Sequence, residues 1–139
     1  MGLSLEDRLD IQELYGAYNH AIDHGRATTF GECFTDDGSL DTGWGDPTVG
    51  TEALVAFVHV VNQTMPGMRH SISNLLLEGD GDQATGHAYL YSYRVGANGH
   101  EVVLTGVYED TLRKVDGEWK FAVRTLAPDT APDTAPVES

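Results

Sequence analysis

Residues 84–95, ATGHAYLYSYRV, place a tyrosine at every second position of their second half. A period of two is typical of a β-strand, because successive side chains point to opposite faces of a sheet. Strands are also predicted over residues 69–77, 101–114 and 118–126. Glycine, aspartate and asparagine fill the breaks between them, and an Asp-Gly pair before the last run is a strong hairpin signal. The second half of the chain therefore predicts a meander of antiparallel strands.

The first half of the chain predicts helices. Apolar residues recur at helical spacing over residues 4–24 and over 51–63, where Thr51 is the expected N-cap. A short helix is predicted over 26–34 and a short strand over 39–44. Helices followed by strands indicate an α+β domain, with the helices on one face of a bent sheet.

Charge restricts the partners of this 139-residue chain. Its formal net charge is −14, so it lacks the basic surface that nucleic acids and anionic membranes require. We expect a small, neutral or apolar ligand, although the charge would equally serve solubility. No apolar run approaches the roughly 18 residues of a membrane span. No signal peptide is visible either, so a cytoplasmic protein is expected.

The sequence contains one cysteine and one short repeat near its C-terminus. Cys33 is the only cysteine, which excludes an intrachain disulfide, and we expect it to have a packing role. Residues 127–139 contain the repeat APDTAPDTAP, which has almost nothing to bury. We therefore predict one domain over residues 1–126, followed by a disordered tail.

Four segments resemble the SnoaL-like branch of the NTF2-like superfamily. They are IQELYGAYNHAIDHG (residues 11–25), FTDDGSLD (34–41), MRHSISNLLL (68–77) and RKVDGEWKF (113–121), and the likeness covers nearly the whole chain short of its tail. The resemblance implies a cone-shaped α+β barrel, in which three N-terminal helices pack on a strongly curved antiparallel sheet. It also implies a deep apolar pocket between the two layers and an enzyme that needs no cofactor or metal.

Within this superfamily the pattern is most similar to scytalone dehydratases, bile acid 7α-dehydratases and hexachlorocyclohexane dehydrochlorinases. These enzymes share an Asp at the end of the first helix and a His at the start of a meander strand, matched here by Asp23 and His70. The bile acid enzymes also have a Tyr five residues before the Asp, which Tyr18 matches. An imidazole can take a proton from carbon, a carboxylate can fix its tautomer, and a phenol can donate to a developing enolate oxygen. The resemblance implies these catalytic roles for the three residues.

The helical wheel turns this implication into a geometric prediction. At 100° per residue Asp23 lies at the edge of the apolar stripe of its helix, so it can face the pocket only if the helix ends near Ile22. A carboxylate at a helix C-terminus is disfavoured by the helix dipole, and a protonated His70 would relieve this. We therefore expect Asp23 and His70 to be in contact.

Further residues are predicted to bind the substrate: Trp44, Phe57, Met68, Asn74, Leu90, Arg94 and Tyr108. The family register turns the even positions of strand 84–95 toward the pocket and places the tyrosines on the outer face. The swapped assignment would instead give a pocket rich in tyrosine. An outer tyrosine face would suit self-association, and the resemblance implies a homo-oligomer, either a dimer or a trimer.

Two other candidate sites are less favoured. His20 and His24 have an i, i+4 spacing that can bind a metal, but His20 falls opposite the apolar stripe, which favours a solvated face. Asp41 resembles the base of ketosteroid isomerases, another branch of the superfamily. It is one residue out of phase, which in a strand means the opposite face.

We interpret the chain as a lyase, such as a dehydratase, that acts on a small, mostly apolar, oxygenated molecule through a His-Asp dyad. A polyketide cyclase or a ketosteroid-type isomerase would use the same pocket. The non-enzymatic alternative is a ligand-binding or dimerisation domain.

Overall fold

The computed structural model describes residues 2–129 of the chain. Apart from the two-residue strand β2, which was not predicted, the elements follow the predicted order of helices, a short strand, a helix and a four-stranded meander. Their bounds are α1 (Leu5–Asp23), α2 (Ala27–Glu32), β1 (Phe34–Asp41), β2 (Thr48–Val49), α3 (Thr51–Thr64), β3 (Met68–Asp80), β4 (Gln83–Gly96), β5 (Gly99–Val115) and β6 (Glu118–Pro128).

The strands form a single six-stranded sheet in the order β2-β1-β6-β5-β4-β3. Strands β3 to β6 are antiparallel, as predicted. The expectation of a wholly antiparallel sheet is wrong, because β1 pairs with β6 in parallel. Parallel neighbours need a long crossover connection, and α3 together with β3 to β5 supplies it. The sheet is therefore mixed.

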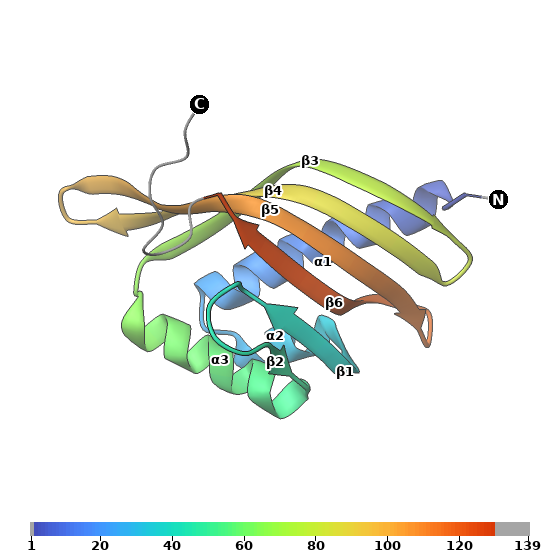
Figure 1. Cartoon of the computed structure of the whole chain (residues 1–139), viewed down its shortest axis with the longest axis horizontal. Coiled ribbons are helices and arrows are strands. Elements are labelled where there is room, and N and C mark those ends of the chain that lie inside the picture. The colour runs from blue at the N-terminus through green and yellow to red at the C-terminus, as the bar shows by residue number, and fades with distance from the viewer. Residues whose placement is uncertain (1, 130–139) are drawn as a thin grey trace.

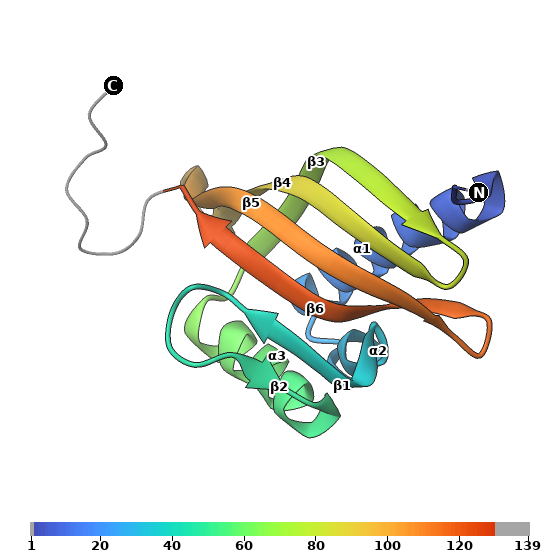
Figure 2. The same cartoon turned by 45° about the vertical axis from the view of Figure 1, so that its right-hand side comes forward.

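All three helices lie on one side of the curved sheet (Figures 1 and 2). The core between the two layers contains residues from each helix and from the meander, among them Ile11, Phe30, Leu54, Leu112 and Phe121, all fully buried. The hairpin of β4 and β5 extends beyond the helices (Figure 1). The apolar interior is therefore enclosed only where helices cover the sheet. No helix in the part described has the length and apolarity that a membrane crossing requires.

Several boundaries differ from the predicted ones by one to five residues, and two differences concern β1 and α3. Strand β1 begins at Phe34, five residues before the predicted start at residue 39. Thr51 is the first residue of α3 and not its N-cap, which is Gly50. Gly50 has a φ of 90°, a conformation that costs glycine little and a β-branched residue much.

The C-terminal strand reaches slightly further than the predicted domain. Strand β6 continues to Pro128, and the Asp129 N–H donates to the Thr105 carbonyl. Residues 130–139, which make up most of the predicted tail, lie outside the described residues.

Strand β4 has the predicted orientation. Ala84, Ala88, Leu90 and Ser92 are buried, whereas Tyr89 is 56% exposed and faces away from the helices. The tyrosines thus lie on the outer face of the sheet. Self-association through this face stays a prediction.

Candidate functional site

A capped helix end places Asp23 at the base of the interior. Asp23 is the last residue of α1, and Gly25 follows with a φ of 70°. The Arg26 N–H donates to the Ala21 carbonyl at 2.9 Å, a Schellman-type closure that stops the helix at this point. The Asn62 amide on α3 donates to the Ile22 carbonyl at 2.9 Å, which ties the end of α1 to α3. The direction of the Asp23 side chain is therefore fixed.

The predicted contact between Asp23 and His70 is present. His70 lies near the start of β3, and its Nδ1 is 2.6 Å from Asp23 Oδ1. The His70 backbone N–H also donates to both carboxylate oxygens, at 3.2 and 3.1 Å. These donors offset the unfavourable placement of a carboxylate at a helix C-terminus.

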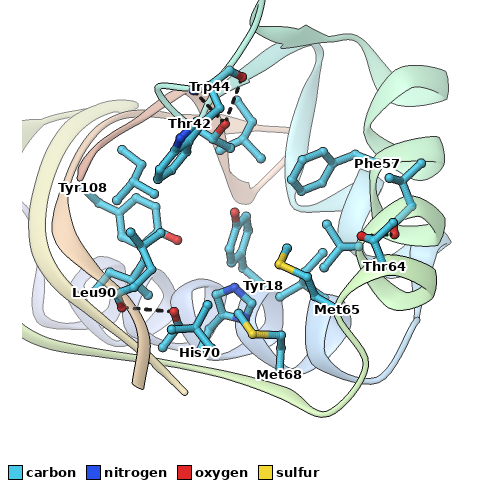
Figure 3. Close-up of a pocket in the computed structure, with 18 residues that line it drawn as sticks. Tyr18, Thr42, Trp44, Phe57, Thr64, Met65, Met68, His70, Leu90 and Tyr108 are labelled. Carbon is cyan, nitrogen blue, oxygen red and sulfur yellow. Dashed lines mark hydrogen bonds between the residues drawn. The ribbon is translucent and has the colours of Figure 1, made fainter. Parts of the chain in front are cut away.

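This contact fixes which nitrogen of His70 faces the interior. With Asp23 as acceptor, the neutral imidazole carries its proton on Nδ1, and Nε2 remains a hydrogen-bond acceptor. The ring points into the cavity (Figure 3). The side chains of His70 and Asp23 are 15% and 7% exposed, so the pair is shielded but not sealed. The arrangement suits a general base.

The cavity beside His70 has a volume of about 430 Å³ and a largely apolar wall. Tyr18 and five of the predicted substrate-binding residues line it, namely Trp44, Phe57, Met68, Leu90 and Tyr108 (Figure 3). Met65 and Val61 of the α3 region add to the apolar wall. A volume of this size suits a small organic molecule.

Two predicted substrate-binding residues do not line the cavity. Asn74 is exposed, has a φ of 55° and lies at a register shift between Ser73 and Leu76. A bulge of this kind reverses which residues face inward, so Asn74 leaves the phase of His70. Arg94 lies beyond a second shift, on the side of β4 that leads into the turn to β5, and its Nη1 is 3.9 Å from Glu101 Oε1.

Few polar groups remain free to meet a ligand in this cavity. The hydroxyl of Ser92 donates to the Leu104 carbonyl at 3.0 Å, and that of Thr64 donates to the Val60 carbonyl at 2.8 Å. The phenol groups of Tyr18 and Tyr108 point into the cavity (Figure 3). Besides Nε2 of His70, the cavity thus offers these two phenols, which also interact with each other, and the indole N–H of Trp44 to orient a substrate.

A buried ion pair lies next to the two phenols, and the sequence analysis missed it. Arg124 on β6 is 0% exposed, and its Nε is 3.2 Å from Asp110 Oδ1 on β5. The Tyr15 hydroxyl donates to the other oxygen of Asp110 at 2.5 Å. The guanidinium carbon lies 3.4 Å from the ring centre of Tyr108 and 4.3 Å from that of Tyr18.

A sequence signal for this pair exists. Asp110 has the same phase as the buried residues Tyr108 and Leu112, and Arg124 has the phase of Leu126. Charged residues at the inward positions of neighbouring strands are uncommon unless they are paired. This pattern would have identified both residues.

Burial controls the protonation of the aromatic groups. Loss of solvent raises the pKa of Tyr18 well above its usual value and also raises that of Tyr108, although the nearby Arg124 opposes both shifts. Both phenols therefore stay protonated near neutral pH and can donate hydrogen bonds. Burial likewise raises the pKa of the Cys33 thiol to about 11, which leaves it a poor nucleophile.

The less favoured candidates lie away from the cavity. His20 and His24 are exposed, with ring centres 5.9 Å apart. Among residues 2–129, no group of three or more His, Cys, Asp or Glu side chains is arranged to hold a metal ion. Leu40 and Thr42 line the cavity, and Asp41 between them does not, which agrees with its predicted phase.

Comparisons with known proteins agree with the fold and extend over most of the chain. Residues 3–125 match the model of the SnoaL-like domain family. A variant of Rv3472, a Mycobacterium tuberculosis protein of unknown function, is 32% identical, with a TM-score of 0.83 over 89% of this chain and 72% of that one. A search of curated proteins finds no match.

Two further solved structures have the same architecture. A Nostoc punctiforme protein of unknown function with a cystatin-like fold is 28% identical, with a TM-score of 0.84 over 96% of this chain and 97% of that one. A Catenulispora acidiphila protein solved in complex with S-DNPA is 24% identical, with a TM-score of 0.80 over 88% of this chain and 92% of that one. This last likeness concerns the fold alone.

Proposed function

Because the chain belongs to the SnoaL-like family, we propose that it is a cofactor-independent lyase that eliminates water or a similar small group from an apolar, oxygenated substrate. The observation that carries the proposal is the 2.6 Å contact between Asp23 and His70 at the wall of an apolar cavity. It gives the cavity one oriented base, which an elimination requires.

The proposed reaction begins at His70. Nε2 takes a proton from a carbon atom of the substrate, and the electron pair of that C–H bond moves to form a double bond. Asp23 holds the ring in place and stabilises the imidazolium that forms. In other sites that use a histidine base, a carboxylate in this position orients the ring and is not itself protonated. We assign the same role to Asp23.

The leaving group departs from the carbon next to the one that loses the proton. As its C–O bond breaks, the imidazolium returns the proton to the departing hydroxyl, and water forms. In this proposal Tyr18 assists by donating a hydrogen bond to that hydroxyl. Its raised pKa keeps the phenol protonated for this task.

The proposed substrate is a small, mostly apolar and uncharged molecule. The wall of the cavity is predominantly aliphatic and aromatic, and the chain has a net charge of −14, which disfavours polyanionic ligands. A neighbour of the same fold was solved with the ligand S-DNPA, which supports ligand binding within this architecture.

An isomerase or cyclase is the second candidate, because the same observation suits it. An imidazole that takes a proton from one carbon can return it to another without loss of any group. The two reactions differ in the mass of the product, which is unchanged for an isomerisation and lower by one water for a dehydration. A purely ligand-binding protein would leave the mass of every ligand unchanged and release it unaltered.

The experiment is turnover of a panel of β-hydroxy ketones, followed by mass spectrometry, in four variants. We expect His70→Gln to lower kcat by about 10²- to 10⁴-fold, the usual range for loss of a general base, and Asp23→Asn to lower it less. His59→Gln and Asp10→Asn, at exposed positions away from the cavity, are the matched controls. Undiminished rates in both His70→Gln and Asp23→Asn would exclude the dyad.

A further inference from the structure

The two phenols of the cavity have unequal environments. The Arg124 guanidinium lies over the ring of Tyr108, with 3.4 Å between its central carbon and the ring centre, compared with 4.3 Å for the ring of Tyr18. Arg124 itself does not line the cavity, so it cannot touch a ligand there. Its charge can reach a ligand only through the rings in between, and Tyr108 is the nearer of the two.

We propose that Tyr108 binds the carbonyl oxygen of the substrate and the enolate that develops on it, so that this cavity selects carbonyl compounds and planar oxyanions such as enolates and phenolates. The catalytic half of this inference rests on the proposed function, because the enolate forms only if His70 removes a proton. The binding of phenolates does not rest on the proposed function, because a phenolate is already an oxyanion and binds without any reaction.

The polar groups of the cavity support the assignment to Tyr108. Ser92 and Thr64 already donate to backbone carbonyls. His70 presents an acceptor and cannot donate from Nε2 to an oxyanion while it acts as a base. The remaining donors are the phenols of Tyr18 and Tyr108 and the indole N–H of Trp44, a residue that is 38% exposed in the segment between β1 and β2. Tyr108 lies on β5, and one strand, β4, separates it from His70 on β3. A planar substrate between them can meet the base at one end and a donor at the other.

Electrostatics favours a neutral donor whose hydrogen bond strengthens as charge develops. Burial keeps the Tyr108 phenol protonated, because it raises the pKa. Arg124 acts in the opposite direction, and after burial it is the largest influence on the pKa of Tyr108. The cation against its ring therefore makes Tyr108 a stronger donor to an oxyanion than the same buried phenol would be without Arg124.

The ion pair gives the cation a fixed position. Asp110 faces Nε of Arg124, and Tyr15 completes the bonding of that carboxylate. Within residues 2–129, neither Nη1 nor Nη2 of Arg124 donates a hydrogen bond, and four aromatic rings lie around the guanidinium. Its charge is therefore incompletely neutralised and lies against the phenol of Tyr108.

The step is balanced without transfer of the phenolic proton. His70 removes the proton next to the carbonyl, and the electron pair of the C–H bond delocalises onto the carbonyl oxygen. Tyr108 keeps its proton and donates a hydrogen bond to that oxygen. Collapse of the enolate then expels the hydroxyl that Tyr18 assists.

The test measures binding and needs no turnover. The probes are 1-naphthol, ring-halogenated 1-naphthols of increasing acidity, and naphthalene, which keeps the ring and lacks the oxygen. Dissociation constants are measured at one pH in the wild-type protein and in the Tyr108→Phe, Tyr18→Phe and His70→Gln variants. Ligand absorbance reports how much bound naphthol is ionised.

We expect wild-type affinity to rise with naphthol acidity. Tyr108→Phe should weaken naphtholate binding by at least about 10-fold, the value of a hydrogen bond to a charged group, and leave naphthalene binding unchanged. Tyr18→Phe, which also removes one cavity phenol, should change naphtholate binding by less than about 3-fold. His70→Gln should retain the preference for naphtholate.

Several results would overturn the inference. Equal losses in Tyr18→Phe and Tyr108→Phe, or no loss in Tyr108→Phe, would remove Tyr108 from this role. If Tyr108→Phe did not fold, wild-type affinity that failed to rise with naphthol acidity would suffice to reject it. Loss of turnover in His70→Gln with unchanged naphtholate binding in Tyr108→Phe would reject this inference and leave the proposed lyase intact. Retained turnover in His70→Gln with weakened naphtholate binding in Tyr108→Phe would reject the proposed lyase and support the binding role of Tyr108.

Discussion

Two carboxylate pairs flank Tyr18, and they differ in how they meet the cavity. Asp23 and His70 join the end of a helix to the start of an edge strand, and the imidazole faces the cavity. Asp110 and Arg124 occupy directly opposite positions on β5 and β6, and both side chains are fully buried. The first pair leaves Nε2 of His70 facing the cavity, whereas aromatic rings cover the guanidinium of Arg124 in the second.

The difference separates a pair suited to chemistry from a pair suited to structure. Asp110 and Arg124 form the sealed pair, and Asp23 and His70 form the open pair. Breaking the sealed pair leaves a buried charge without solvent or partner, which is costly. Breaking a partly exposed pair costs less stability, because water and cavity space remain available. Substitutions in the two pairs should therefore affect different measurements, and four experiments can sharpen or break this contrast.

The largest expected effect follows from removing Arg124, the cation of the sealed pair. Arg124→Met strands the Asp110 carboxylate, and we expect it to lower the free energy of unfolding by about 3–5 kcal/mol. The control is Arg113→Met, because Arg113 forms a 3.1 Å pair with Asp37 in which both side chains are exposed. That pair should contribute less than about 1 kcal/mol. Urea unfolding measures both, and equal losses would contradict the contrast.

A second effect tests the packing that completes the sealed pair. Gly86 on β4 leaves room for the Tyr15 hydroxyl, and a methyl group there would collide with it. Gly86→Ala should displace this hydroxyl from Asp110 and lower the free energy of unfolding by about 1–3 kcal/mol. Gly16→Ala is the control, because open space surrounds Gly16 on α1 and alanine favours helices. A neutral Gly86→Ala would show that Tyr15 does not support the pair.

The open pair should tolerate substitution. We expect His70→Gln to change the free energy of unfolding by less than about 1 kcal/mol, because the Asp23 carboxylate keeps the backbone N–H of position 70 as a donor. His59→Gln on α3 provides the baseline in the same urea measurement. A loss above about 3 kcal/mol would make this pair structural like the other.

The smallest effect concerns a third carboxylate, near the surface. Hydrogen bonds from Trp119 first, then from Lys114 and Ser4, lower the pKa of Asp7 from 3.8 to about 2. Since the folded pKa lies below the unfolded one, this stabilisation is present above about pH 4 and is lost as the pH falls toward 2. Asp7→Asn should flatten the acid dependence of the melting temperature in that window. An unchanged slope would contradict the assignment.

The sequence predicted the meander and the Asp23–His70 contact for different reasons. Strands such as β4 were found because alternation reflects the geometry of any strand. The contact came from family resemblance, since residues far apart in sequence have no periodic relation. The parallel pairing of β1 with β6 was missed because periodicity does not reveal which strands are neighbours. Asn74 and Arg94 were misplaced because register shifts next to each interrupt the alternation.

The sealed pair was missed for another reason. Aspartate and arginine in a strand are ordinarily assigned to the solvent face, because these residues are seldom buried, and Asp110 and Arg124 are exceptions to that rule. The phase of each strand marks its charged residue as inward, but only the alignment of β5 with β6 shows that the two charges lie opposite each other.

The tautomer of His70 tests the site most directly. Nitrogen NMR of the neutral imidazole distinguishes a proton on Nδ1 from one on Nε2 without any substrate. The contact with Asp23 requires the proton on Nδ1, with Nε2 free toward the cavity, and Asp23→Asn should weaken that preference. A neutral His70 protonated on Nε2 in the wild-type protein would leave the cavity without its base and contradict the proposed chemistry.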